Sequence, residues 1–281
     1  MPYSSMRARG GIEDAIGVLR ERGLVDRLAK VGASDAGDLA LGRAKGERGP
    51  SGILNELALA ELFSATRDAV AGTRARGRSP LLVGGDCPVL LGALAALETP
   101  GLIMLDGHED AWPPRNSPTG EGSDSELGVA LGLVPDLPAP LDSWMPLLAP
   151  EDTVLLGPRD AAELGEAGID SLVARVGLFL DDQEVAKLGA TSVIETALQR
   201  LQAAEFWLHL DLDVLHTDHF AAVDYQQPGG LSWTEVEQLV EGALADPRCA
   251  GLSVVIYNPH LDPSRQDAHQ LIDFLSQALQ V

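Results

Sequence analysis

The sequence predicts an α/β fold in which helices cover both faces of a parallel sheet. Short apolar runs alternate with longer helical stretches along the 281 residues, which is the pattern of parallel strands joined by helical crossovers. The runs are continuously apolar rather than alternating, as expected for strands that are buried on both faces. Three of the runs end in residue types that bind metals, at the edge where α/β sheets place their ligand sites.

The expected strands and helices largely alternate along the chain. The expected strands cover residues 81–83, 102–105, 154–156, 176–180, 206–212 and 252–257. The expected helices cover residues 56–75, 88–97, 125–133, 192–203, 233–245 and 265–279. Residues 74–80 and 135–150 are interpreted as loops rather than as linkers. The length fits one large α/β domain, so residues 1–281 are expected to form a single domain.

The charge balance excludes several classes of partner. The chain carries 20 basic and 42 acidic side chains, a formal charge of −22, which disfavours nucleic acid and anionic membranes. The apolar fraction of 45% is far above that of disordered acidic tails. Two cysteines cannot form a disulfide framework, and no stretch reads as a signal peptide or a membrane span. We therefore expect a soluble cytoplasmic protein.

The strand expected at 102–105 is followed by Asp106, His108 and Asp110. Side chains alternate along an extended chain, so these three residues point the same way. Two carboxylates and an imidazole at the end of a buried strand are costly unless a partner, such as a divalent cation, neutralises them.

The strand expected at 206–212 carries a second cluster of the same kind, formed by His209, Asp211 and Asp213. Aspartates that converge with histidine suit Mn²⁺, Fe²⁺ or Zn²⁺, and two bridged ions can activate one water. Alternatively, each cluster is a solvated strand end. The presence of both clusters at the ends of apolar strands favours the metal site.

A third cluster is the Gly-Gly-Asp-Cys run at residues 84–87, which joins a strand to a helix that starts at Pro88. Asp86 is placed to cap that helix. Cys87 is held at the junction, although a single cysteine is more often a small buried apolar residue than a ligand.

These runs, in this order, resemble the arginase–agmatinase (ureohydrolase) family. That family carries a Gly-Gly-Asp-His motif, an Asp-Ala-His-x-Asp motif and a Ser-x-Asp-x-Asp-x-x-Asp-Pro motif. Weaker matches are Gly-Pro-Arg-Asp at 157–160, Pro-Gly-Gly-Leu-Ser at 228–232 and Asn-Pro at 258–259. The similarity extends over almost the whole chain.

The resemblance implies a three-layer α/β/α fold around a mostly parallel sheet, and a homo-oligomer. It also implies a two-metal site, usually of manganese, whose bridging hydroxide hydrolyses a guanidinium or amidine C–N bond of a small molecule. By the resemblance, both ions are bridged by Asp106 and Asp211, one site is completed by His108 and Asp213, and the other by Asp110 and Cys87. Asp110 would also carry the proton to the leaving amine.

The chain departs from the family at residues expected to contact metal or substrate. Cys87 replaces a histidine ligand, and because thiolate suits Zn²⁺ or Fe²⁺ better than Mn²⁺, we expect weaker binding or a different metal there. Ile256 replaces the glutamate that grips the guanidinium. Ala161 and Ala162 replace the acidic position that binds the α-amino group in arginases, so L-arginine is not the expected substrate.

The segment after Asp110 lacks the family's His-Gly pair. Glu121, Asp124 or Glu126 would replace the missing anion, or they open the next helix, where the helix dipole favours acidic residues. Both interpretations are kept for Asp124, and helix opening is favoured for Glu126.

Three further residues are assigned to the surroundings of the site. His209 is expected to touch the metal-site aspartates from its own strand without binding the ions. His216 replaces the family's third aspartate, and either hydrogen-bonds beside the ligands or lies in the loop. Residues 217–227 are expected to line the pocket, with Tyr225 as the best ring for substrate contact.

Two other functions are weighed against the hydrolase. A non-catalytic or regulatory protein with a partly kept metal site would explain the loss of the glutamate and of the His-Gly pair. A cysteine nucleophile at Cys87 would need an adjacent general base, and none is evident. The family's first strand also has no counterpart, because the sheet lost an outer strand or because the start is shortened.

Overall fold

A parallel sheet forms the centre of the fold. The computed structural model describes residues 3–5, 10–41 and 46–280, and in them six strands follow the order β1-β6-β5-β2-β3-β4 with every neighbouring pair parallel. The strands are β1 (Leu81–Val83), β2 (Pro100–Leu105), β3 (Thr153–Leu156), β4 (Leu178–Leu180), β5 (Glu205–Asp211) and β6 (Cys249–Val255). The predicted α/β fold with a parallel sheet is confirmed.

Helices of very different length surround the sheet. The α-helices are α1 (Ala15–Glu21), α2 (Leu24–Ala29), α3 (Glu56–Ala75), α4 (Val89–Leu94), α5 (Glu126–Ala130), α6 (Ala161–Ala167), α7 (Asp182–Leu188), α8 (Ala190–Arg200), α9 (Trp233–Leu244) and α10 (Gln266–Ala278). Short 3₁₀ turns are η1 (Ile12–Asp14), η2 (Gly122–Asp124), η3 (Leu141–Ser143), η4 (Pro150–Asp152), η5 (Leu172–Ala174) and η6 (Leu212–Val214). Within the described residues, no helix combines the length and apolar composition needed to cross a bilayer.

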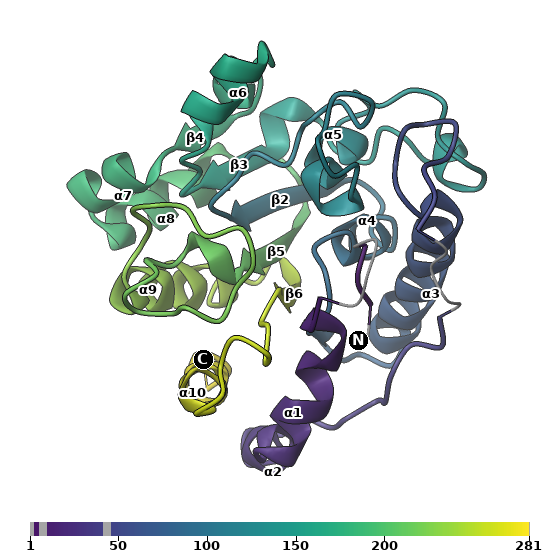
Figure 1. Cartoon of the computed structure of the whole chain (residues 1–281). Coiled ribbons are helices and arrows are strands. Elements are labelled where there is room, and N and C mark those ends of the chain that lie inside the picture. Colours follow the sequence, from purple (N-terminus) through teal and green to yellow (C-terminus); the bar gives the residue numbers. More distant parts are fainter. Residues whose placement is uncertain (1–2, 6–9, 42–45, 281) are drawn as a thin grey trace.

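The helices lie on both faces of the sheet, with α3, α4 and α5 on one side and α8, α9 and α10 on the other (Figure 1). The chain steps across the sheet in one direction from β2 to β3 and β4, and in the opposite direction from β5 to β6. Because such crossovers are right-handed, the connecting helices fall on opposite faces. The crevice between β2 and β5 is therefore a topological switch point, where ligand sites of open α/β sheets lie.

The core explains the continuous apolar runs of the sequence. Every residue of β2 and β3 is buried, because helices or neighbouring strands cover both faces. The largest fully buried side chains include Phe63 of α3, Phe206 and Trp207 of β5, and Tyr257 after β6.

The start of α4 differs from the prediction. The helix begins at Val89 rather than at Pro88, and Asp86 does not cap it. The Asp86 carboxylate instead accepts hydrogen bonds from the backbone and hydroxyl of Ser5 and from the backbone N–H of Cys87. Asp86 therefore ties the N-terminal segment to the end of β1.

Several short elements carry too weak a pattern to be predicted from sequence. Helices α1, α2, α6 and α7 have at most 7 residues each, or about two turns, too few for a clear apolar period. The strand expected at 252–257 ends at Val255, because Ile256 has a left-handed φ of 63°. The described residues before Leu81 contain no strand.

Candidate metal centre

Two neighbouring strands bring the predicted ligands together. Asp106 directly follows β2, and Asp211 is the last residue of β5, the strand that pairs with β2. His108 and Asp110 lie in the loop after β2, and Asp213 lies in η6. All five are at the switch point between β2 and β5.

One part of this cluster, the His108 end, consists of Asp106, His108 and Asp213. His108 Nδ1 lies 2.8 Å from Asp213 Oδ2 and 3.8 Å from Asp106 Oδ1. Burial alone would lower the pKa of His108, but the Asp213 carboxylate raises it to about 9. Burial opposes the ionisation of Asp213, yet His108 and a hydrogen bond from the Gly107 N–H lower its pKa. Without a cation, this end is held by a buried ion pair.

The turn at residues 157–160 braces the His108 end. Arg159 donates from Nη2 to the Asp213 carbonyl at 2.6 Å and from its backbone N–H to the Gly107 carbonyl at 2.9 Å. Asp160 accepts from the Glu109 backbone N–H at 3.1 Å. The sequence contains this turn as a recognisable motif, but the bracing depends on contacts between loops that are distant along the chain.

The other part, the Cys87 end, consists of Cys87, Asp110, Glu126, His209 and Asp211. Cys87 Sγ lies 2.7 Å from Asp211 Oδ2. Burial, and then the repulsion of neighbouring carboxylates, raises the pKa of Cys87 and of Asp211 well above their usual ranges. In the absence of a cation, the thiol therefore stays protonated and donates a hydrogen bond to Asp211.

Two glycines aim Cys87 at this cluster. Gly84 and Gly85 have left-handed φ angles of 82° and 74°, which only glycine adopts without steric cost. The chain thus turns sharply at the end of β1 and delivers Cys87 into the buried space beside β5.

Glu126 lies in the first turn of α5, as predicted for a helix-opening residue. Its side chain is also completely buried in the cluster. One ligand atom each of Cys87, Asp110 and Glu126 lie within 4.8 Å of one another. Burial raises the pKa of both Asp110 and Glu126 well above the usual range. The charge of Glu126 adds to the shift of Asp110, and the charge of Asp106 adds to that of Glu126, whereas the contact with Asp110 lowers the pKa of Glu126. Two carboxyl groups can lie this close in a buried site only if they share a proton or bind a cation.

His209 points into the same space from β5. It is fully buried, and its Nδ1 lies 2.6 Å from the Ser253 hydroxyl of β6. Burial lowers the pKa of His209 to about 3, so the ring is neutral. In the part of the chain that the structure describes, its Nε2 has no hydrogen-bond partner.

The donor atoms of the cluster fit a divalent cation. Asp106 Oδ2, both side-chain oxygens of Glu126 and His209 Nε2 are buried without a partner among the described residues. Buried polar atoms are normally paired, and unpaired ones cost about 1–3 kcal/mol each. Triads of possible ligands with atoms within 4.8 Å occur at both ends. A divalent cation would satisfy these atoms and neutralise the carboxylates.

The cluster opens into a cavity of about 370 Å³. The residues of the cluster that line the cavity are Cys87, His108, Asp110, Asp211 and Asp213. Further acidic groups, including Asp124, Glu163 and Asp224, line the rest, and the described lining residues include no lysine or arginine.

Strained backbone surrounds this cavity. Asp110, Tyr225 and Ile256 all line it, and their φ angles are 45°, 55° and 63°. Such angles cost roughly 1–3 kcal/mol in residues other than glycine and concentrate at functional sites.

Of the predicted pocket residues, Glu121, Asp124 and Tyr225 lie at the cavity. Asp124 and Tyr225 line its wall, and the Tyr225 hydroxyl donates to Glu121 Oε2 at 3.0 Å. Burial raises the pKa of Glu121 to about 7, although the Tyr225 hydrogen bond opposes this shift. Asp124 accepts hydrogen bonds from Thr119 and Ser117, so it orders the loop as well.

Of the two interpretations considered for His216, the structure supports the one in which it lies in the loop. Its Nδ1 accepts a hydrogen bond from the Asp218 backbone, and its ring packs against His219 at a centroid distance of 5.7 Å. His216 is not among the described residues that line the cavity. It lies in the loop because the chain turns outward after η6.

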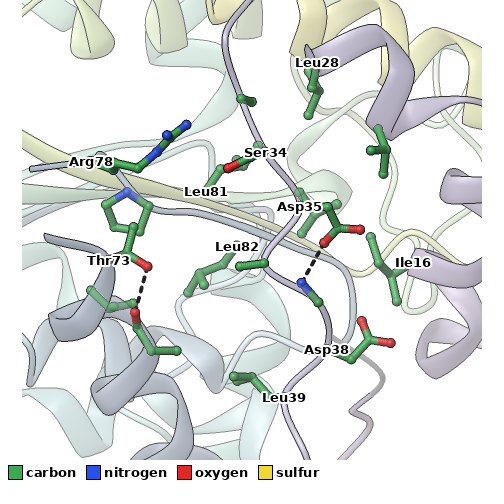
Figure 2. A pocket seen from close by; sticks show the side chains of 18 of the residues that line it. Ile16, Leu28, Ser34, Asp35, Asp38, Leu39, Thr73, Arg78, Leu81 and Leu82 are labelled. Atoms are coloured by element: carbon green, nitrogen blue, oxygen red, sulfur yellow. Dashed lines mark hydrogen bonds between the residues drawn. The ribbon is translucent and has the colours of Figure 1, made fainter. Parts of the chain in front are cut away.

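A second cavity, of about 310 Å³, lies at the start of β1 (Figure 2). Figure 2 shows Leu81 and Leu82 on one side and Ile16 and Leu28 on the other, with the Asp35 side chain turned toward its own loop backbone. Arg20 pairs with Asp35 and Asp38 at 2.8 Å each, so its charge is already compensated. The two cavities share no lining residue.

The comparison with known proteins identifies the family. A model of the arginase family matches residues 6–279 of the chain. The chain belongs to the arginase family. The arginase of Bacillus caldovelox is 29% identical over 279 residues, which span 95% of this chain and 92% of that protein. Arginase-1 of Homo sapiens is 25% identical over 287 residues, with 97% and 87% covered.

Solved structures agree with this membership. The structure of Bacillus caldovelox arginase matches this arginase-family chain with a TM-score of 0.85 at 27% identity, covering 100% of this chain and 96% of that one. Agmatine ureohydrolase of Thermoplasma volcanium shares the fold, with a TM-score of 0.72 at 19% identity and 99% and 87% covered. The three-layer α/β/α fold that the resemblance implied is confirmed.

Proposed function

We propose that this arginase-family chain is a metal-dependent hydrolase that cleaves a guanidino or amidine C–N bond in a small molecule other than L-arginine. The observation that carries the proposal is the buried cluster of carboxylates at the switch point, which contains unpaired polar atoms and several of whose residues line a cavity. A cluster of this kind is costly without a cation, and the family membership gives the chemistry that such a cation serves.

Two divalent ions would be held by residues of both ends. We assign Asp106 and Asp211 to bridging positions, His108 and Asp213 to one ion, and Cys87 and Asp110 to the other. When bound, the ions supply the positive charge that activates a water and stabilises the charge that develops on the substrate. The nitrogen and oxygen donors of the His108 end suit Mn²⁺, whereas the Cys87 thiolate suits Zn²⁺ or Fe²⁺.

Asp110 is proposed to hand a proton to the leaving amine. Its side chain is buried at the wall of the cavity that a substrate would occupy. A carboxylate in this position can accept a proton on one oxygen and pass it to the leaving amine.

The charge of the cavity favours a cationic substrate without a carboxylate. Acidic side chains line the walls, and the described lining residues offer no lysine or arginine to a substrate carboxylate. Ile256 cannot hydrogen-bond a guanidinium, so we assign that contact to Asp124 on the cavity wall and to Glu121, which lies behind it against Tyr225. L-arginine, which carries a carboxylate, fits these walls less well than an agmatine-like amine.

The test is metal analysis followed by a screen for urea or ammonia release. Purified protein, loaded with Mn²⁺ or Zn²⁺, is offered agmatine-like amines, guanidino acids, formimino compounds and amides. We expect release from at least one cationic guanidino or amidine compound, and none from the Asp211→Asn variant. A homo-oligomer and a cytoplasmic location stay predictions, to be checked by light scattering and by cell fractionation.

A non-catalytic arginase-fold protein is the second candidate. The observations that favour it are Ile256 in place of a guanidinium-binding carboxylate and Cys87 in place of an imidazole. Protein that holds two ions per chain and yet releases no product from any compound of the screen would establish this candidate and exclude the hydrolase.

A further inference from the structure

The imidazole of His209 has one ring nitrogen anchored and the other unpaired. Nδ1 lies 2.6 Å from the Ser253 hydroxyl, and the same hydroxyl accepts a hydrogen bond from Trp207 Nε1 at 2.9 Å. Nε2 is buried and has no partner among the described residues. A ring held by one nitrogen while the other faces acidic groups is the usual arrangement of a histidine that binds a metal ion.

The groups that face Nε2 are themselves unpaired. One ligand atom each of Asp106, Glu126 and His209 lie within 4.8 Å of one another. Asp106 Oδ2 and both Glu126 oxygens lack hydrogen-bond partners within residues 3–5, 10–41 and 46–280. A second triad with atoms within 4.8 Å joins His209 to Cys87 and Asp211. His209 is thus the residue that the two triads share.

The sequence gives a second reason to consider His209 as a ligand. The chain has cysteine at 87, where the Gly-Gly-Asp-His motif has an imidazole, and it has histidine at 209, where the Ser-x-Asp-x-Asp motif has a serine. The two exchanged side chains meet in space, because Cys87 and His209 belong to one triad. The imidazole that is absent from the end of β1 is present on β5.

We propose that His209 is a metal ligand of the Cys87 end and that it supplies, through Nε2, the imidazole that the Gly-Gly-Asp-Cys turn lacks. The inference rests on the proposed metal-dependent function and changes its ligand set. The ion at this end is then held by sulfur from Cys87, nitrogen from His209 and oxygen from Asp211, with Glu126 within reach of both Cys87 and His209. A mixed sulfur, nitrogen and oxygen set favours Zn²⁺ or Fe²⁺ over Mn²⁺.

The competing role for His209 is positional. The ring would then carry its proton on Nε2 and hydrogen-bond to Asp106 or Glu126 without contacting an ion. Both roles predict some loss of metal affinity on substitution, so the decisive variant returns the imidazole to position 87.

The experiment compares wild type, His209→Ser, His209→Gln, the exchange variant Cys87→His/His209→Ser, and His216→Gln as a matched control outside the cluster. Metal content is measured after dialysis against Zn²⁺, and Co²⁺ is titrated while the thiolate-to-cobalt absorption band is followed. Circular dichroism confirms folding, and His209→Gln preserves side-chain volume if the serine variant unfolds.

We expect two ions in wild type and in His216→Gln, and one ion in His209→Ser and His209→Gln. The affinity for the second ion should fall by at least about a hundredfold, the upper range for residues that only orient ligands. The exchange variant should recover the second ion. Cobalt bound to wild type should show the thiolate band, which both single His209 variants lose.

Three results would overturn part of the scheme, and they are distinct. If wild type binds no divalent ion, the proposed function fails together with the ligand role of His209. If wild type binds two ions and the His209 variants keep both with affinity within about threefold, the function stands and the His209 ligand is wrong. If the exchange variant folds but holds one ion, His209 is a positioning residue and the proposal is wrong.

Discussion

The two ends of the metal cluster solve the same electrostatic problem in different ways. At the His108 end, the buried Asp213 carboxylate is matched by an imidazolium at 2.8 Å, and Arg159 braces the Asp213 backbone carbonyl. At the Cys87 end, Asp110, Glu126 and Asp211 crowd together beside a protonated thiol, and both Glu126 oxygens have no partner among the described residues.

The difference indicates which end depends on a cation. The His108 end is compensated by its own charges, so an ion that binds there must first displace a proton from His108, whose pKa is about 9. The Cys87 end has no internal cation, and its carboxyl groups keep protons instead. We therefore expect metal to order the Cys87 end more than the His108 end.

The largest expected effect comes from the residue that touches both ends. Asp211 contacts Cys87 through Oδ2 and accepts from the Asp213 backbone N–H through Oδ1 at 2.9 Å. Asp211→Asn should remove both ions and lower product release by more than about a hundredfold, beyond the cost of losing an orienting contact. Metal analysis and the release assay measure this. Asp218→Asn, on an exposed loop, is the control, and an Asp211 variant that keeps two ions would contradict the bridging role.

A smaller effect is expected from a change at the Cys87 end alone. Cys87→Ser exchanges a soft ligand for a hard one, so affinity for Zn²⁺ should fall by about tenfold or more while affinity for Mn²⁺ changes less. Competition with a zinc-sensitive dye measures both constants. Cys249→Ser, which changes the other cysteine, should leave them unchanged. Two equivalent manganese ions in wild-type protein would show that the thiolate does not differentiate the two ends.

The contrast between the ends also follows what the sequence could predict. Asp106, His108 and Asp213 are predicted to converge because they follow two buried strands at alternating positions. The prediction succeeds because the strand ends are adjacent, although His108 lies in a loop and Asp213 in η6. Glu126 joins the Cys87 end only because α5 packs on the loop after β2, where its Gly128 N–H donates to the Asp110 carbonyl at 3.0 Å. No periodicity in the sequence reports that contact.

The elements of the fold also divide into those that the sequence predicts and those that it does not. Buried strands such as β2 and β5 are predicted because their apolar runs are continuous, and the order of motifs locates the switch point. Helices α6 and α7 escape prediction because about two turns give no clear period. The bracing by Arg159 and Asp160 and the left-handed backbone of Ile256 depend on tertiary contacts that spacing along the chain does not encode.

A stability measurement distinguishes the ends without any substrate. The raised pKa of Glu126 means that the folded, metal-free protein favours its protonated form, so stability is lost as the pH rises through that folded pKa. Glu126→Gln should therefore stabilise metal-free protein at pH near 8.5 by about 1–3 kcal/mol, the cost of an unsatisfied buried group, and change little at pH near 5.5.

Thermal unfolding with chelator at the two pH values tests this, with the exposed Glu166→Gln as the control. Saturating metal should instead make wild type more stable than Glu126→Gln. An ion at a hundred times its dissociation constant adds about 2.7 kcal/mol to the stability of a protein that binds it. A Glu126 variant that gains as much from metal as wild type does would show that this carboxylate is not part of the Cys87 end.

The smallest effect is expected outside both ends, at Glu121 behind the cavity wall. Glu121 has a pKa of about 7, so it is neutral below that pH and anionic above it. For a cationic substrate and metal-saturated protein, KM should fall by about threefold as the pH rises through 7, because Glu121 does not line the cavity and its charge acts on the substrate only from a distance, for which under about 1 kcal/mol is expected. Glu121→Gln should keep the low-pH KM throughout. Tyr225→Phe removes the hydroxyl that stabilises the anion at 3.0 Å, so the midpoint should move above 7. A KM that stays constant with pH in wild type would place the substrate cation away from Glu121.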